Sequence, residues 1–154
     1  MVDEIDNLVI ANDNSSSQVV LSGSEEALEN ISKRITAKRF LKLNVSGAFH
    51  SPFMKEPSSQ FSKYLDTLDF NQPSIPVISN SNPSLCNDSK ELKVRLKNQM
   101  CNGVRWRETM DLMVENSILQ MVEIGPSNVL AGLGKRHFKG VKISQVSSAD
   151  QTKY

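Results

Sequence analysis

The sequence predicts an α/β fold, in which strands and helices alternate around an apolar core. Short runs of β-branched and aliphatic residues, such as IPVISN (75–80) and VKISQV (141–146), are separated by segments with apolar residues at helical spacing. The 154 residues are 38% hydrophobic and 23% charged, which is a globular composition with enough length for one core or two small ones. Alternation of this kind favours parallel pairing of the strands.

The first 46 residues predict the order strand, strand, helix, strand. DNLVIAN (6–12) and SQVVLSG (17–23) are strand-like and are separated by turn-forming residues. Ser24 is placed to cap a helix whose apolar residues recur on one face. RFLKLNV (39–45) alternates leucine and valine with lysine and asparagine, as a half-buried strand does.

After residue 46, the pattern predicts helices that alternate with apolar strands. Ser51 and Pro52 suit the start of a helix, and a buried strand at 75–80 leads into SNSNPS (79–84), which is expected to be a loop. The methionine and tryptophan stripes of the later helices are expected to pack in the core. Three of the expected helices are marked by apolar residues: Met54, Phe61, Leu65 and Leu68 in the first, Leu92, Leu96 and Met100 in the second, and Trp106, Met110 and Met113 in the third. A fourth, short helix is expected at residues 128–136. The last two strands are expected at residues 118–125 and 141–146.

Composition excludes several classes of protein. There are 18 lysines and arginines against 17 aspartates and glutamates, so the formal charge of +1 gives no overall attraction to nucleic acid or to an anionic membrane. Cys86 and Cys101 form no CxxC pair, and the two histidines lie far apart, so neither a disulfide framework nor a metal site is expected. No apolar run is as long as a membrane helix, and the amino terminus is acidic, unlike a signal peptide. We therefore expect a cytoplasmic protein.

The stretch GAFHSPFM (47–54) presents one histidine, His50, in a run of small and apolar residues. A histidine that acts as a general base needs a nucleophile, and the sequence lacks the Gly-x-Ser-x-Gly pattern that exposes a serine on a sharp turn. The nearest candidate, Ser127 in GPSNV, follows Pro126 and lacks the second glycine, so we expect it to cap the next helix. On these residues alone, His50 is more often a loop or core histidine than a catalyst.

Four stretches, in this order, resemble the carboxyl-terminal half of malonyl-CoA:acyl carrier protein transacylases. They are ANDNSSSQVVLSG, VSGAFHSPFM, PVISN with NGVRW, and VEIGPSNVLAGLGKR. The resemblance spans nearly the whole chain and is greatest to the bacterial-type enzymes of fatty acid synthesis, with the acyltransferase domains of polyketide synthases next. It implies an α/β-hydrolase-like core that carries an incomplete ferredoxin-like small subdomain. Residues 1–46 would belong to the small subdomain and residues 47–154 to the core.

By this resemblance, His50 is the catalytic general base. In the family, a serine attacks the malonyl thioester, the histidine takes its proton, and the malonyl group passes from the serine to the phosphopantetheine thiol of acyl carrier protein. The other ring nitrogen is held by a main-chain oxygen near the position of Arg105. Malonyl-CoA and the carrier protein are substrates, and no cofactor takes part. The family's serine and malonyl-binding arginine lie upstream and are not in this sequence, so the chain alone is expected to be inactive.

The resemblance also implies contacts with the substrate and the partner. Phe49 matches a position where a bulky ring goes with malonyl rather than methylmalonyl selection, because it leaves no room for an α-methyl branch; the alternative is a core residue. Asn12 and Asn14 match a loop at the substrate cleft, or they form a turn. The family's carrier protein is acidic, so basic groups are candidate docking surfaces, or else solvated faces. These groups are Lys33, Arg34, Lys38, Arg39 and Lys42, and Lys135 with Arg136.

Two functional classes follow from these observations. The first is a malonyl-CoA:acyl carrier protein S-malonyltransferase, present as a partial chain that holds the general base without the nucleophile. The alternative is a non-catalytic module that binds acyl carrier protein or coenzyme A. A separate amino-terminal half would complete the malonyltransferase but is not needed by the binding module. Neither class has nucleic acid or a membrane as partner.

Overall fold

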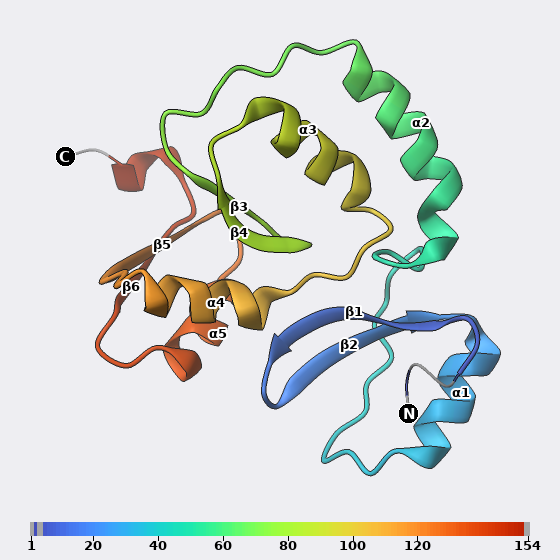
Figure 1. The fold of residues 1–154 in the computed structure, drawn as a ribbon. Coiled ribbons are helices and arrows are strands. Elements are labelled where there is room, and N and C mark those ends of the chain that lie inside the picture. Colours follow the sequence, from blue (N-terminus) through green and yellow to red (C-terminus); the bar gives the residue numbers. More distant parts are fainter. Residues whose placement is uncertain (1, 3–4, 153–154) are drawn as a thin grey trace. The chain divides into compact units, whose positions relative to one another are not determined.

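The computed structural model describes residue 2 and residues 5–152, and it divides into two compact units, residues 1–106 and 107–154. Helices and strands are mixed along the chain, as predicted (Figure 1). The elements are β1 (Leu8–Ser15), β2 (Gln18–Gly23), α1 (Glu25–Arg34), the 3₁₀ turn η1 (Pro52–Met54), α2 (Lys55–Asp66), β3 (Val77–Ser79), β4 (Asn82–Cys86), α3 (Ser89–Asn98), α4 (Trp106–Glu115), β5 (Gln120–Ile124), α5 (Val129–His137), β6 (Lys142–Val146) and the 3₁₀ turn η2 (Ala149–Thr152). The boundary that the sequence places near residue 46 stays a prediction.

The first three elements form as the sequence predicts. Strands β1 and β2 pair antiparallel as a hairpin, and α1 follows (Figure 1). Ser24 is the N-cap of α1, and its Oγ accepts a hydrogen bond from the N–H of Ala27 at 3.2 Å. Leu8 of β1 and Ile31 of α1 are buried in one small core. Local signals were sufficient here because the turn, the cap and the apolar face all lie close together in the sequence.

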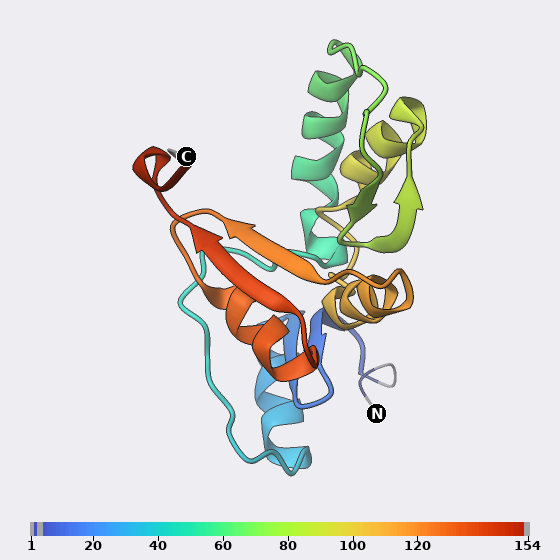
Figure 2. The same cartoon turned by 90° about the vertical axis from the view of Figure 1, so that its left-hand side faces the viewer.

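The strand predicted at residues 39–45 is absent, so this prediction was wrong. Figure 2 shows the chain from α1 to η1 as an extended trace that is not drawn as a strand. The alternating side chains Leu41, Leu43 and Val45 are 60%, 53% and 63% exposed. The alternation is present, but a strand also requires a hydrogen-bonding partner, and the described residues supply none.

The helix predicted to begin at Ser51 forms in two parts, η1 and then α2. Ser51 is fully buried, and its Oγ accepts a hydrogen bond from the N–H of Phe53, which makes it the N-cap of η1. Pro57 falls in the first turn of α2. The N–H groups of the first turn have no partner within the helix, so the N–H that proline lacks costs no helical hydrogen bond. Helix α2 packs against α3, and the hydroxyl of Ser58 donates to the main-chain oxygen of Lys97 at 3.0 Å.

Strands β3 and β4 form a hairpin that the sequence did not predict. Strand β3 occupies the middle of the strand expected at 75–80, but it is partly exposed rather than buried. Strand β4 begins within the expected loop at 79–84 and pairs antiparallel with β3, not parallel. Its residues have little strand propensity, and a side chain from α3 supports it: Nη1 of Arg95 donates to the main-chain oxygen of Ser84 at 2.9 Å. Such a contact, distant in the sequence, overrides local propensity.

The second unit contains the parallel pairing that the alternation predicts. Strands β5 and β6 pair in parallel, with Gln120 opposite Lys142 at one end. Met110 of α4 is fully buried, as expected for the methionine stripe. Helices α4 and α5 are joined by a contact of 3.1 Å between Nε2 of His137 and Oδ1 of Asp111.

A carboxylate from β5 caps helix α5, and the predicted cap by Ser127 was wrong. Oε2 of Glu123 accepts from the N–H of Ala131 at 2.7 Å, and Oε1 accepts from the N–H of Leu130 at 3.3 Å. The hydroxyl of Ser127 donates to Oε1 of the same carboxylate at 3.1 Å. Asn128 occupies the N-cap position without a side-chain capping bond. The first N–H groups of the helix are thus satisfied from the preceding strand, where a negative charge also suits the helix dipole.

We expect the stability of the second unit to depend on pH through Glu123. The hydrogen bond from Ala131 is the largest influence, and it holds the pKa of the Glu123 carboxyl below its usual range. Desolvation raises the pKa but is outweighed, because the bonds from Leu130 and Ser127 also lower it. A lowered folded-state pKa means that the carboxylate stabilises the folded state above its unfolded pKa of about 4.3. This contribution is lost as the pH falls through the folded pKa.

Glu123→Gln should therefore lower the Tm more at pH 7 than at pH 3, as measured by thermal unfolding with circular dichroism. Glu115→Gln, an exposed substitution in the same unit, is the matched control and should change the Tm little at either pH. An equal loss for Glu123→Gln at both pH values would contradict the capping role of the charged carboxylate.

Candidate active site

His50 lies in the first unit, in the loop that leads into η1. Its φ is 60°, in the left-handed region that residues other than glycine seldom occupy. Its N–H donates to the main-chain oxygen of Met100 at 3.0 Å. The next residue, Ser51, is fully buried, and its hydroxyl donates to the main-chain oxygen of Ala48. The loop is thus fixed on both sides of the histidine, as is common where an unusual backbone conformation serves a function.

The imidazole of His50 is oriented by main-chain oxygens of the α3–α4 connection (residues 99–105). Nδ1 lies 3.0 Å from the oxygen of Gln99 and 3.1 Å from the oxygen of Asn102. Because a carbonyl oxygen can only accept, Nδ1 carries a hydrogen and donates it, which places the lone pair of the neutral ring on Nε2. Two neutral peptide oxygens therefore hold the half-buried ring in the tautomer that takes up a proton at Nε2.

The α3–α4 connection is also joined to two other parts of the first unit. The N–H of Asp13 in β1 donates to the oxygen of Val104, and the N–H of Val104 donates to the oxygen of Ala11, each at 2.8 Å. The N–H of Arg105 donates to the oxygen of Asn80, just after β3, at 2.8 Å. These bonds fix the segment that orients His50, because its main chain is paired on both sides.

Three other predicted site residues lie either in this connection or in strand β1, which is hydrogen-bonded to it. Asn12 forms an isolated parallel bridge with Val104, so it lies beside the segment that orients the histidine. Asn12 and Asn14 both belong to strand β1, so they lie neither in a turn nor in the loop that the resemblance implied, and their contact with substrate stays a prediction. The oxygens on Nδ1 of His50 belong to Gln99 and Asn102, which precede Arg105 in the same connection. The orienting role of Arg105 itself stays a prediction.

Phe49, the predicted selector of the acyl group, is 46% exposed, so in this chain it is not a core residue. A Cβ added to Gly47 would lie 3.5 Å from its ring, so the ring packs over that glycine. The ring is next to the general-base candidate in the sequence and is accessible. Its position leaves it available for a ligand.

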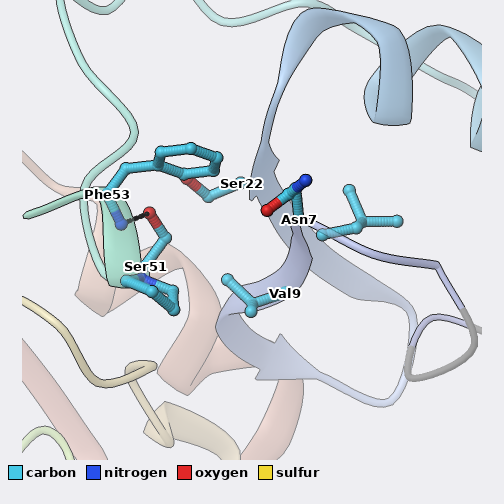
Figure 3. Close-up of a pocket in the computed structure, with 7 residues that line it drawn as sticks. Asn7, Val9, Ser22, Ser51 and Phe53 are labelled. Atoms are coloured by element: carbon cyan, nitrogen blue, oxygen red, sulfur yellow. Dashed lines mark hydrogen bonds between the residues drawn. The ribbon is translucent and has the colours of Figure 1, made fainter.

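A pocket of about 300 Å³ opens beside the histidine loop (Figure 3). Its lining comes from the start of β1, the end of β2, and η1 with its N-cap. These residues are Asn7, Leu8, Val9, Ser22, Ser51, Pro52 and Phe53. Figure 3 shows the ring of Phe53 and the side chain of Asn7 on either side of it, with the Oγ of Ser51 bonded to the N–H of Phe53. Sequence reasoning missed this pocket because the fold joins three separate segments to form it. His50 does not line it.

The predicted basic docking residues between 33 and 42 lie at the end of α1 and on the segment that follows. Lys42 lies 3.5 Å from the carboxylate of Glu25, with side chains 87% and 89% exposed, so the pair contributes little stability. Lys33 and Arg34 line a shallow polar depression together with two acidic side chains. Their role in docking stays a prediction.

Two kinds of feature, a metal-binding cluster and a membrane-spanning helix, are absent from the part of the chain that the structure describes. No three histidine, cysteine, aspartate or glutamate side chains gather there in an arrangement that could hold a metal ion. No helix of the described residues combines the length and apolar character needed to cross a bilayer.

The chain has a mixed α/β fold and belongs to the acyl transferase domain family, whose description it matches over residues 1–151. Within this family, several relatives of the chain are named malonyl CoA-acyl carrier protein transacylase. The chain is 42% identical over 143 residues to the malonyl CoA-acyl carrier protein transacylase of Synechocystis sp., and the match covers 93% of this chain and 49% of that protein. The family predicted from the four sequence stretches is confirmed.

Solved structures agree with this assignment. The crystal structure of the Synechocystis malonyl-CoA:ACP transacylase matches with a TM-score of 0.92 and 40% identity, over 97% of this chain and 51% of that chain. A complex of a type II polyketide acyl-carrier protein with its malonyl-transacylase matches with a TM-score of 0.87 and 32% identity, over 97% and 50%. The chain therefore spans about half the length of the relatives that it matches.

Proposed function

We propose that the chain is the carboxyl-terminal half of a malonyl-CoA:acyl carrier protein S-malonyltransferase of fatty acid synthesis, acting in the cytoplasm, with His50 as its general base. The observation that carries the proposal is the geometry of the ring. Main-chain oxygens of Gln99 and Asn102 hold the Nδ1–H, which leaves the lone pair on Nε2 to accept a proton. The malonyl transacylase relatives support the choice of substrate.

The nucleophile of this reaction comes from the part of the enzyme that this chain does not span. A serine hydroxyl attacks the malonyl thioester carbonyl while Nε2 of His50 takes the serine proton. The proton passes to the departing coenzyme A thiolate, which leaves a malonyl ester on the serine. The phosphopantetheine thiol of acyl carrier protein then gives its proton to Nε2 and attacks the ester, and the serine oxygen recovers the proton. The peptide oxygens on Nδ1 stabilise the imidazolium that forms in each half-reaction.

Three residues near the base contact the substrate in this proposal. Phe49 packs against the malonyl group and excludes an α-methyl branch, which is supported by its exposed ring next to the base. Asn12 and Asn14 reach the substrate from β1, and the bridge between Asn12 and Val104 supports this position. The main chain of Arg105 helps to hold the imidazole, since it closes the same connection.

The proposal includes a domain arrangement and a partner surface. Residues 1–46 are the later part of a ferredoxin-like small subdomain, supported by the order β1, β2, α1, and residues 47–154 close an α/β-hydrolase-like core. Acidic acyl carrier protein docks against the basic residues between 33 and 42, with Lys135 and Arg136 as a second group. The solved complex of a related malonyl-transacylase with its acyl-carrier protein supports a protein partner of this kind.

A fusion protein tests the proposed function. The amino-terminal half of the Synechocystis relative, joined to the 154-residue chain, should transfer radiolabelled malonyl from malonyl-CoA to acyl carrier protein. The amino-terminal half alone is the control and should not transfer, because it lacks the base. A folded fusion without transfer would contradict the proposal. Binding of carrier protein by the chain, together with an inactive fusion, would instead favour the non-catalytic module.

Phe49→Ser in the fusion protein should shift selectivity toward the branched substrate. Removal of the ring makes room for an α-methyl group, so the ratio of kcat/KM for methylmalonyl-CoA to that for malonyl-CoA should rise by about tenfold or more. Phe53→Ser is the matched control, because Phe53 is a second exposed phenylalanine, four residues further on in η1. Selectivity that stays the same in Phe49→Ser, or that changes equally in both variants, would remove Phe49 from acyl selection.

A further inference from the structure

The helix that follows the His50 loop, α2, carries a buried serine that is bonded to the segment orienting the histidine. Ser58, near the start of α2, is 8% exposed. Its hydroxyl donates to the main-chain oxygen of Lys97 at 3.0 Å. Lys97 belongs to the last turn of α3 and lies two residues before Gln99, whose oxygen holds the imidazole. The histidine loop and the oxygens on its ring are therefore joined at a second point, away from the ring.

The oxygens at the end of α3 accept hydrogen bonds from the polypeptide that carries the histidine. The last carbonyl groups of a helix have no partner within it, so they need donors from elsewhere. The oxygen of Lys97 accepts from the hydroxyl of Ser58. The oxygen of Gln99 accepts from Nδ1 of His50, and the oxygen of Met100 accepts from the N–H of the same residue, each at 3.0 Å. The His50 loop and the start of α2 thus cap the end of α3 together.

Loss of the Ser58 hydroxyl would change the site through the end of α3. A partly buried carbonyl group without a donor costs free energy, so the oxygen of Lys97 would turn toward water or another donor. A turn of this peptide group would also move the oxygen of Gln99, because only one residue separates Lys97 from Gln99. The recorded bond of Ser58 goes to the main chain of α3 and not to the imidazole. Its effect on the ring is therefore indirect.

We propose that Ser58 is a positioning residue for malonyl transfer, which keeps the hydrogen of the neutral His50 ring on Nδ1 by fixing the end of α3 to α2. The inference rests on the proposed function, which makes Nε2 of His50 the base. The role belongs to the hydroxyl of Ser58 and not to α2 in general. Ser59, the next residue of the same helix, is exposed and provides the matched control.

Nitrogen-15 NMR of the imidazole in the 154-residue chain tests the proposal, at an alkaline pH where the ring is neutral. The wild-type signals of His50 should show the hydrogen on Nδ1, and His137→Ala identifies which signals belong to His50. In Ser58→Ala, the ratio of the Nδ1–H to the Nε2–H tautomer should fall at least about threefold, because one hydrogen bond of ordinary strength changes an equilibrium by about this factor or more. Ser59→Ala should leave the ratio unchanged.

Two comparisons separate positioning from stability. Nζ of Lys93, on an earlier turn of α3, donates to the main-chain oxygen of Leu68 at 2.7 Å. Lys93→Met removes this bond, so it should lower the Tm without a change in the tautomer ratio. If Ser58→Ala does not fold, Ser58→Thr and Ser58→Val decide the question, because they have nearly the same shape and only threonine keeps a hydroxyl. The ratio should stay near that of the wild type with threonine and fall with valine.

The fusion protein with the Synechocystis amino-terminal half measures the effect on the reaction. Ser58→Ala should lower kcat about three- to tenfold and change the KM for malonyl-CoA less than about twofold, because the base is displaced and the substrate-binding groups are not. Ser59→Ala should have the wild-type rate.

A wild-type kcat in Ser58→Ala, or an unchanged tautomer ratio in the folded variant, would overturn the positioning role and leave the proposed function intact. An equal fall of the ratio in Lys93→Met would also overturn it, since packing of α3 in general would then be the cause. A lower ratio in Ser58→Ala, together with a folded wild-type fusion that transfers nothing, would contradict the proposed function and leave the effect of Ser58 on the ring in place.

Discussion

His50→Ala in the fusion protein is expected to lower kcat for malonyl transfer by about 10²–10⁴-fold, the usual effect of losing a general base. In the proposed mechanism both half-reactions depend on the same Nε2, which takes a proton first from the serine and then from the carrier protein's thiol. The loss should therefore appear in the formation of the malonyl ester and in its transfer. Single-turnover assays with radiolabelled malonyl-CoA would measure the first step, and steady-state transfer to acyl carrier protein would measure the whole reaction.

Two further variants separate the loss of the base from a change in the fold. His50→Asn removes the base but suits the left-handed backbone, because asparagine tolerates a φ of 60° better than most residues. It should be as inactive as His50→Ala, with a Tm close to that of the wild type. His137→Ala removes the other histidine, which contacts Asp111 in the second unit, and should retain most of the activity. A nearly normal rate in His50→Ala would remove His50 from the mechanism.

The 154-residue chain alone is expected to show no measurable malonyl transfer. In the proposed mechanism the chain holds the base without its nucleophile and so cannot form the acyl-enzyme, and the groups that stabilise the transition state and bind the malonyl carboxylate come from the other half of the enzyme. The assay is incubation of the purified chain with radiolabelled malonyl-CoA and acyl carrier protein. Mass spectrometry of the chain should find no added malonyl group.

Two serines of the chain provide the outcome that would contradict this expectation. Ser51 is fully buried and donates its hydroxyl hydrogen to the oxygen of Ala48, and Ser127 donates its own to the carboxylate of Glu123. Neither hydroxyl is placed as a nucleophile in these arrangements. A malonyl ester on either serine, or labelled carrier protein that disappears with Ser127→Ala, would show that the chain carries its own nucleophile.

The elements that the sequence predicted well are those whose signals are local. The cap at Ser24, the turn between β1 and β2 and the apolar face of α1 all lie within a few residues of one another. The failures have distant causes. Residues 39–45 have no partner strand among the residues that the structure describes, β4 is supported by Arg95 from another element, and α5 is capped by Glu123 from the strand before it. Patterns of residue type do not report such contacts.

The resemblance pointed to the candidate side chain and to a main-chain oxygen near Arg105 as its support, but not to the residues that supply the oxygens. GAFHSPFM and the three other stretches pointed to His50 through resemblance, whereas the histidine alone did not distinguish a base from a loop residue. The groups that decide the tautomer are peptide oxygens of Gln99 and Asn102. Every residue type has such an oxygen, so no motif marks the positions that orient the ring.

This support by peptide oxygens makes the orientation of His50 insensitive to alanine scanning. Gln99→Ala and Asn102→Ala would leave both carbonyl groups in place, so a scan of the α3–α4 connection would record neither position as catalytic. Sequence drift at these two sites is therefore compatible with an unchanged catalytic geometry. A change in the length of the connection is not, because it would move the peptide groups themselves. The side chains of this loop can therefore be exchanged, whereas the path of its backbone must stay the same.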